Sequence, residues 1–197
     1  VSVPPIKSMN YKGTLRLRFS EPYPNDYKLV DYHSIDEGFL VNEKIKDVLS
    51  EANLKNIDFV PATIKHDNGI AEGYYFVHIY NNVSAINIEE SDCEVSKTVS
   101  MKEHLIWLEK AVLSDEKLNK VKLKNRLLFY ADEYSSFILM HKSLVEKVEA
   151  IEPKGVSITK GSVEADKYLS VSEKMMDKFP KCKKVITTLR GSINANH

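Results

Sequence analysis

The sequence has few of the features that mark secreted, metal-binding or membrane proteins. Its two cysteines, Cys93 and Cys182, form no CxxC pair, so we expect two free thiols in a reducing compartment. The six histidines include no HExxH pair or other close pair at metal-ligand spacing. No apolar run approaches the ~20 residues of a membrane helix, and no signal-peptide core lies near Val1. We therefore expect a globular protein of the cytoplasm that needs no metal and no cofactor.

Motifs of enzyme chemistry are also absent. The chain contains no GxSxG, no GxxxxGK[ST] and no GxGxxG after a strand. Glu89 and Glu90 are a poor acid–base pair, because adjacent residues on a strand face opposite ways and in a loop are simply solvated. His78 would share one strand face with Phe76 and Tyr80, where a structural role is favoured over a catalytic one. These absences favour a binding protein that is not an enzyme.

Size and composition indicate a single domain over residues 1–197. The chain is 43% hydrophobic and 28% charged, with only seven glycines and seven prolines, which is ordinary for a globular protein and too few for a linker-rich one. A chain of this length buries roughly 70% of the surface that its unfolded form exposes. It therefore needs neither a disulfide nor a metal for stability.

Charge is unevenly distributed along the chain, although the net charge is zero. Residues 81–116 hold 3 basic and 8 acidic side chains, a net charge of −5, whereas residues 117–197 hold 16 and 9, a net charge of +7. A general nucleic-acid binder would carry an overall basic excess. The pattern instead leaves two readings open, ordinary surface scatter or charge that steers a partner protein.

Hydrophobic periodicity predicts strands and short helices. Residues 13–20 and 56–64 alternate between apolar and polar side chains, and residues 73–81 form the most β-like run of the chain. A helix of about three turns is predicted after Asn42, a good N-cap residue. Residues 104–113, which include Trp107, fit either a helix or a strand, and residues 89–94 read as an acidic loop.

A strand–helix–strand unit occurs twice in the pattern. With an offset of 99 residues, Ile45 corresponds to Leu144 and Leu49 to Val148, and the apolar runs before them also correspond. A chance match between two ordinary amphipathic units is the alternative. We expect an α+β fold with a mainly antiparallel sheet and packed helices, two similar lobes over about 38–88 and 127–163, and an extra C-terminal helix over 163–180.

The same two regions resemble a family of bacterial polymorphic-toxin immunity proteins, whose genes lie beside toxin genes. The resemblance rests on the short apolar runs, the amphipathic helices, the strand at residues 57–61 and the Tyr-rich strand at 73–81, followed by residues 83–87. Leu128-Phe129, residues 137–140 and Gly155 match the second half of the family pattern. The basic segment at 117–126 and the tail beyond Ser162 depart from the family pattern.

The resemblance implies a protein that binds a cognate toxin domain and blocks it without chemistry of its own. Family members often neighbour nucleases of the HNH superfamily in Rhs-type effectors of type VI or contact-dependent systems. The resemblance implies no direct contact with nucleic acid or membrane. The alternatives are a non-catalytic adaptor or structural subunit of a secretion system, and a small hydrolase.

An acidic inhibitor surface can mimic the phosphate backbone that a nuclease binds. The candidate toxin-binding residues are Glu89, Glu90, Asp92, Glu94, Asp115 and Glu116.

Overall fold

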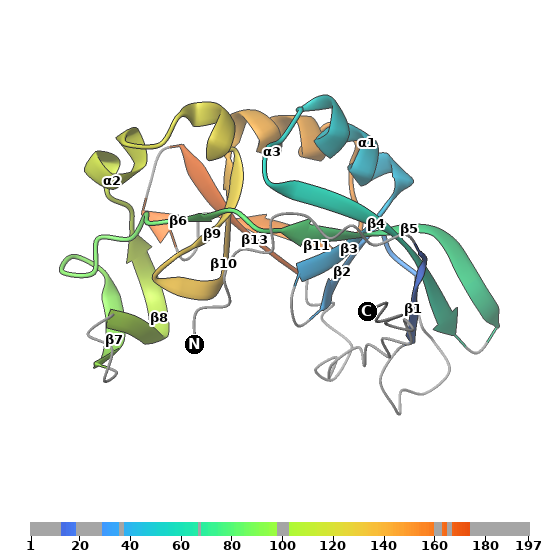
Figure 1. The fold of residues 1–197 in the computed structure, drawn as a ribbon, viewed down its shortest axis with the longest axis horizontal. Coiled ribbons are helices and arrows are strands. Elements are labelled where there is room, and N and C mark those ends of the chain that lie inside the picture. Colours follow the sequence, from blue (N-terminus) through green and yellow to red (C-terminus); the bar gives the residue numbers. More distant parts are fainter. Residues whose placement is uncertain are drawn as a thin grey trace, which may run out of the picture.

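A computed structural model describes residues 13–18, 29–35, 38–66, 68–97, 103–159, 163–164 and 167–173. They form two five-stranded sheets and a smaller three-stranded sheet. Two helices lie side by side on the same side of the two large sheets (Figure 1). Most neighbouring strands are antiparallel, so the expected α+β fold with mainly antiparallel sheets is confirmed.

The first large sheet has the order β1-β4-β5-β3-β2, with β1 (Leu15–Arg18), β2 (Tyr32–Ile35), β3 (Gly38–Asn42), β4 (Ile57–His66) and β5 (Gly69–Ile79). The second has the order β11-β13-β10-β9-β6, with β6 (Asn82–Val83), β9 (Leu128–Ala131), β10 (Tyr134–His141), β11 (Val156–Thr159) and β13 (Tyr168–Glu173). The third has the order β12-β8-β7, with β7 (Asp92–Lys97), β8 (Glu103–Val112) and β12 (Val163–Glu164). The helices are α1 (Glu43–Glu51), α2 (Asp115–Asn119), α3 (Lys142–Glu149) and the 3-10 turn η1 (Leu123–Asn125).

Local sequence explains the first elements. Leu15 and Leu17 of β1 are buried while Arg16 and Arg18 are exposed, as the alternation predicts. Helix α1 begins after Asn42, whose side chain accepts the backbone N–H of Ile45 at 3.3 Å.

The fold contains the same unit twice. Strands β2-β3, helix α1 and strands β4-β5 form one copy, and β9-β10, α3, β11 and β13 form the other, with the same strand order in each sheet. The offset of 99 residues holds in the backbone: Asn53 and Glu152 both have φ 48°, and Asn56 (φ 62°) corresponds to Gly155 (φ 85°). These equivalent left-handed residues make a periodicity match by chance untenable.

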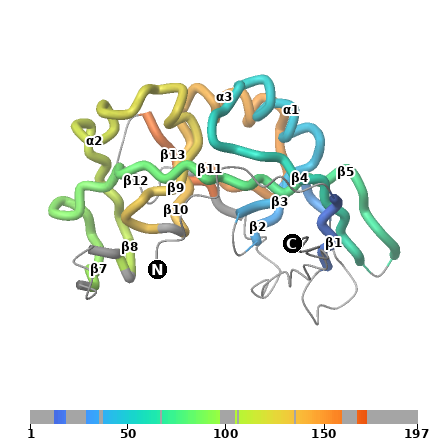
Figure 2. The backbone as a smooth tube through the Cα atoms, viewed as in Figure 1, coloured from blue at the N-terminus to red at the C-terminus, as the bar shows by residue number. Residues whose placement is uncertain are grey.

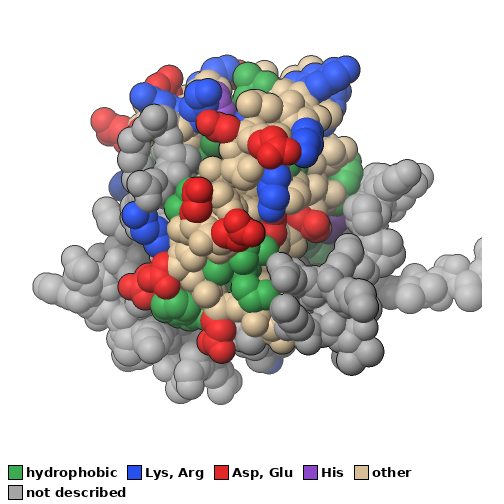
Figure 3. All heavy atoms as spheres, turned by 90° about the vertical axis from the view of Figure 1, so that its left-hand side faces the viewer, with side chains coloured by type: hydrophobic (Ala, Val, Ile, Leu, Met, Phe, Trp, Pro, Cys, Tyr) green, Lys and Arg blue, Asp and Glu red, His purple; other side chains and the backbone are tan. Residues whose placement is uncertain are grey.

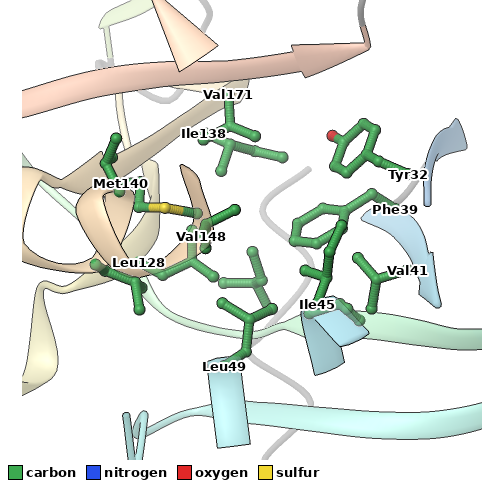
Figure 4. Close-up of a cluster of buried hydrophobic side chains, with 14 residues drawn as sticks. Tyr32, Phe39, Val41, Ile45, Leu49, Leu128, Ile138, Met140, Val148 and Val171 are labelled. Carbon is green, nitrogen blue, oxygen red and sulfur yellow. The ribbon is translucent and has the colours of Figure 1, made fainter. Parts of the chain in front are cut away.

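The two units share one hydrophobic core. Buried side chains from the first unit, including Phe39 and Leu49, meet those of the second, including Met140 and Val148. Figure 4 shows the two sets pointing toward one another. The chain passes directly from β5 through Asn81 into β6, and so crosses from the first large sheet to the second (Figure 2).

Close contacts join the turn before β11 to the start of the first unit. The backbone N–H of Asp31 donates to the Lys154 carbonyl at 3.0 Å, and the Lys154 N–H donates to the Asp31 carboxylate at 2.8 Å. A Cβ on Gly155 would lie 2.5 Å from Val30 Cγ2 and 2.7 Å from the Tyr32 carbonyl oxygen. This approach of backbone to backbone requires glycine.

The structure corrects several predicted elements. Of the helix and strand alternatives for residues 104–113, the strand holds as far as Val112, where β8 ends. The predicted acidic loop at 89–94 is instead a turn followed by β7. The C-terminal helix expected over 163–180 is wrong for 163–164 and 168–173, which are β12 and β13. Strand β13 fills the gap between β10 and β11, where an aromatic and β-branched YLSVSE run completes both ladders. Residues 174–180 lie outside the described part.

Candidate protein-binding surface

The acidic residues singled out from the sequence lie in an insert between the two units. This insert, residues 82–126, carries β6, β7, β8, α2 and η1, and forms the left-hand end of the molecule in Figure 1. Its inward side chains, among them Leu105 and Leu118, form a second core with Phe129 and Leu139 of the second unit. The insert is therefore a packed part of the fold rather than a loose loop.

Backbone hydrogen bonds connect the segments that carry the acidic residues. The Asn87 N–H donates to the Val112 carbonyl at 2.8 Å, and the Ser114 N–H donates to the Ala85 carbonyl at 2.8 Å. Ile86 and Leu113 form an isolated β-bridge. Residues 85–87 and 112–114 are thus hydrogen-bonded to each other. The acidic turn that follows Asn87 and the helix α2 that follows Ser114 therefore begin close together.

All six candidate acidic residues are exposed. Glu89 and Glu90 lie in the turn before β7, Asp92 and Glu94 on β7, and Asp115 and Glu116 in the first turn of α2. Glu116 pairs with Lys120 at 2.8 Å, which holds the pKa of its carboxyl below the ordinary value through a hydrogen bond from the lysine. On this end of the molecule, Asp and Glu side chains are spread from top to bottom, with hydrophobic side chains among them in the lower part, and Lys and Arg lie mostly in the upper part (Figure 3).

Trp107 lies on β8, which pairs with β7 to form a two-stranded ribbon, and is 47% exposed. In the antiparallel pair of β7 and β8, Trp107 stands directly opposite Glu94. Side chains of directly opposite residues point to the same face of a sheet. The indole and the carboxylate are therefore neighbours on the outer face of the ribbon.

Two β-bulges explain why this tryptophan faces outward. Val95 pairs with Leu105 but Glu94 with Trp107, so Ile106 is an extra residue; Glu109 is a second extra residue before the next pair. Inward side chains of β8 consequently recur every third residue, at Leu105, Leu108 and Ala111. In a regular strand Trp107 would share the buried face of Leu105.

A buried carboxylate holds the insert onto the second unit. Glu133, in the turn between β9 and β10, is 9% exposed and accepts the Ser84 hydroxyl at 2.7 Å and the Ala85 N–H at 3.1 Å. Lys117 Nζ donates to the same carboxylate at 3.0 Å and to the Ile86 carbonyl at 2.6 Å. Burial alone would raise the pKa of Glu133, but these donors outweigh it and lower that pKa.

Cys93 faces inward from β7 against the second core. Burial, together with the nearby Asp92 carboxylate, raises the pKa of its thiol. A thiol in this environment is a poor nucleophile at neutral pH.

Metal-binding clusters and membrane-spanning helices are both absent from the described residues. No group of three or more His, Cys, Asp and Glu side chains there could hold a metal ion. No helix among them is long and apolar enough to cross a membrane.

From the sequence alone we propose the six acidic residues but do not single out the exposed Trp107 or the buried Glu133. Trp107 lay in a run whose period-three apolar pattern resembles a helix, and the bulges that expose it have no sequence signature. Glu133 lies in a polar turn, and only the tertiary contacts of Ser84 and Lys117 make it a buried anchor.

Comparison with known proteins agrees with the resemblance seen in the sequence. No curated protein matches the chain. The model of the immunity protein family Imm11 matches residues 3–163, well over half of the chain. The match spans the whole first unit, the acidic insert and the second unit as far as β12. The chain therefore belongs to the immunity protein family Imm11, a family of proteins that confer immunity to toxins.

Proposed function

We propose that this immunity protein binds a cognate toxin domain in the cytoplasm and blocks it sterically and electrostatically, without catalysis. The toxin in this proposal is a nuclease, of the HNH superfamily, at the C-terminal end of an Rhs-type effector delivered by a type VI or contact-dependent system. The two units and the insert act as one domain, since the units share a core and Glu133 holds the insert in place.

The observation that carries the proposal is the exposed acidic surface of the insert. Glu89, Glu90, Asp92 and Glu94 follow one another along a cross-linked turn and strand, with Asp115 and Glu116 on the adjoining helix. A nuclease needs a basic surface to hold phosphates, and an acidic partner can occupy it. Complementary charge also speeds encounter, which matters for an inhibitor that must capture a toxin before damage occurs.

The proposal predicts that neutralising this surface abolishes protection. Replacing Glu89, Glu90 and Glu94 by Gln and Asp92 by Asn should weaken binding to the toxin domain encoded beside this protein and sensitise cells that produce both. The matched control replaces four other exposed residues, Glu51, Glu72, Glu146 and Glu149, by Gln.

Both variants remove the same charge from exposed positions, so a general effect of net charge would weaken them equally. The proposal requires that only the first variant loses toxin affinity and protection. It also requires that the association rate of the wild type falls more steeply with salt than that of the first variant. The free toxin must cleave DNA or RNA. Unchanged protection by the first variant would rule out the acidic surface as the binding site. A toxin without nuclease activity would leave immunity in place and remove the nuclease assignment.

A further inference from the structure

We infer that Trp107 and Glu94 together form a binding site for a guanidinium group, and that its occupant is an arginine side chain of the toxin domain. This inference rests on the proposed function and specifies the chemistry of the contact. The two residues stand directly opposite each other on the outer face of the β7–β8 ribbon.

The pair offers the two contacts that a guanidinium uses. Its planar cation stacks on an aromatic face, and its N–H groups donate in parallel to a carboxylate. Directly opposite residues have Cβ atoms roughly 5 Å apart, which brings an indole plane and a carboxylate within reach of one arginine. Lysine, a compact and strongly hydrated cation, would gain less from the same pair.

The side chains of Trp107 and Glu94 stabilise nothing else in the described part of the molecule. Among the described residues, no ring contact, side-chain hydrogen bond or ion pair involves the side chain of Trp107 or Glu94. Their neighbours Cys93 and Leu108, by contrast, pack inward. An exposed tryptophan beside an unused carboxylate is the kind of anchor that dominates protein interfaces.

The two bulges add a second, independent observation. They bracket Trp107 and Leu108 and reverse the facing of Trp107, which a regular strand would bury. Bulges disrupt the ladder and are concentrated where a strand must re-aim a side chain. The surrounding charge favours a cationic partner, because Glu109, Asp92 and the turn at Glu89–Glu90 are acidic and exposed and outnumber the exposed Lys110 opposite Asp92.

Trp107 is the only tryptophan of the chain, so its fluorescence reports on this site alone. The full chain is titrated with the toxin domain encoded beside it, with calorimetry in parallel. The inference requires an emission change that saturates at one toxin domain per chain. A 1:1 complex by calorimetry with unchanged emission would overturn the inference and leave the proposed function standing. Absence of any complex would overturn both.

Variants then test the pair itself. Trp107→Ala should raise the Kd at least about 10-fold, Trp107→Phe should lose less, and Glu94→Gln should lose several-fold. The control is Ile70→Ala, because Ile70 is 66% exposed at the tip of the β4–β5 hairpin. Thermal unfolding verifies that each variant is folded. An equal loss in Ile70→Ala and Trp107→Ala would contradict the assignment.

The arginine is identified by replacing each arginine of the toxin domain with lysine. One replacement should weaken binding to the wild-type chain about 10-fold and have little further effect on the Trp107→Ala variant. The inference is overturned if no arginine couples to Trp107 in this way. It is also overturned if Trp107 emission changes with chain concentration in the absence of toxin, since a second copy would then occupy the site.

Discussion

Asn42 and His141, 99 residues apart, do the same work in the two copies of the repeated unit. Each is the last residue of a strand, and each caps the helix that follows with its side chain. Asn42 accepts the Ile45 N–H at 3.3 Å, and His141 Nδ1 accepts the Ser143 N–H at 3.2 Å. The two units therefore place a capping side chain at the same position, although the residue is Asn in one and His in the other.

Removal of the first cap should destabilise the protein. Asn42→Ala deletes the acceptor for the Ile45 N–H and the 2.6 Å hydrogen bond that Asn42 donates to Asp31. Urea denaturation should show a loss of about 1–2 kcal/mol in the free energy of unfolding. The comparison variant His141→Asn keeps a cap in the second unit but loses the edge contact of His141 with Tyr168 at 5.2 Å between ring centroids, so it should cost less than Asn42→Ala, about 0.5–1 kcal/mol. An unaffected Asn42→Ala variant would show that the cap contributes nothing.

The contact between the units is tested by two glycines with similar φ angles. A Cβ on Gly155 (φ 85°) would lie less than 3 Å from atoms of Val30 and Tyr32, whereas a Cβ on Gly73 (φ 77°) would have no atom beyond its chain neighbours within 4 Å. Gly73→Ala should cost about 1–2 kcal/mol, from backbone strain alone. Gly155→Ala should cost about 1–3 kcal/mol more, because the methyl group also pushes the units apart. Equal costs, measured by thermal or urea unfolding, would show that the close approach carries no energy.

The repeat could be predicted from the sequence because it depends on interactions between residues that are close along the chain. Apolar spacing at Ile45 and Leu144 and the cap at Asn42 are fixed by residues a few positions apart. The strand patterns at residues 56–64 and 73–81, which lie in β4 and β5, were predicted for the same reason, since alternation and β-propensity are local properties.

Elements set by tertiary contacts were either left undecided or predicted wrongly from the sequence. The bulges of β8 give a three-residue spacing of Leu105, Leu108 and Ala111, which left helix and strand undecided. β13 depends on the open edges of β10 and β11, which no local pattern reveals. For the candidate site the sequence predicts the acidic charge but not the geometry, because exposure of Trp107 follows from pairing register.

His33 should make stability fall as the pH drops below neutrality. Burial lowers its pKa from 6.5 to about 4, despite the opposing effect of the Asp31 carboxylate. Between these values the unfolded chain binds a proton that the folded chain does not, so the free energy of unfolding decreases as the pH falls from about 6.5 to 4. The slope from this one group is at most about 1.4 kcal/mol per pH unit.

His33→Phe installs the residue found at the equivalent register position of the second unit, because His33 pairs with Leu40 as Phe129 pairs with Leu139. Phe129 packs against Tyr168 with ring centroids 5.8 Å apart, as His33 packs against Tyr74 at 5.7 Å. The variant should lose the slope between pH 6.5 and 4, measured by urea unfolding at several pH values. Asn42→Ala, which keeps the histidine, should retain it. An unchanged slope in His33→Phe would assign the titration elsewhere.

Glu133 should contribute stability that is present above pH about 4.5 and lost below it. Its folded pKa lies under the ordinary 4.5, so protonation on acidification removes the charged contacts to Lys117 and Ser84 as the pH falls through the folded value. Glu133→Gln should cost about 1–3 kcal/mol at pH 7, with a gap to wild type that narrows as the pH falls below 4.5. Glu116→Gln, at an exposed ion pair, should show no such gap. A gap that is the same at pH 7 and 3.5 would contradict the charged network.

The central claim, that the acidic insert is the face that meets the toxin, is tested most directly by hydrogen–deuterium exchange on the complex with the cognate toxin domain. The account predicts slower exchange in the turn 88–90 and along β7 and β8, with α1 and the β4–β5 hairpin unchanged. Protection confined to α1, α3 or the β4–β5 hairpin would contradict it.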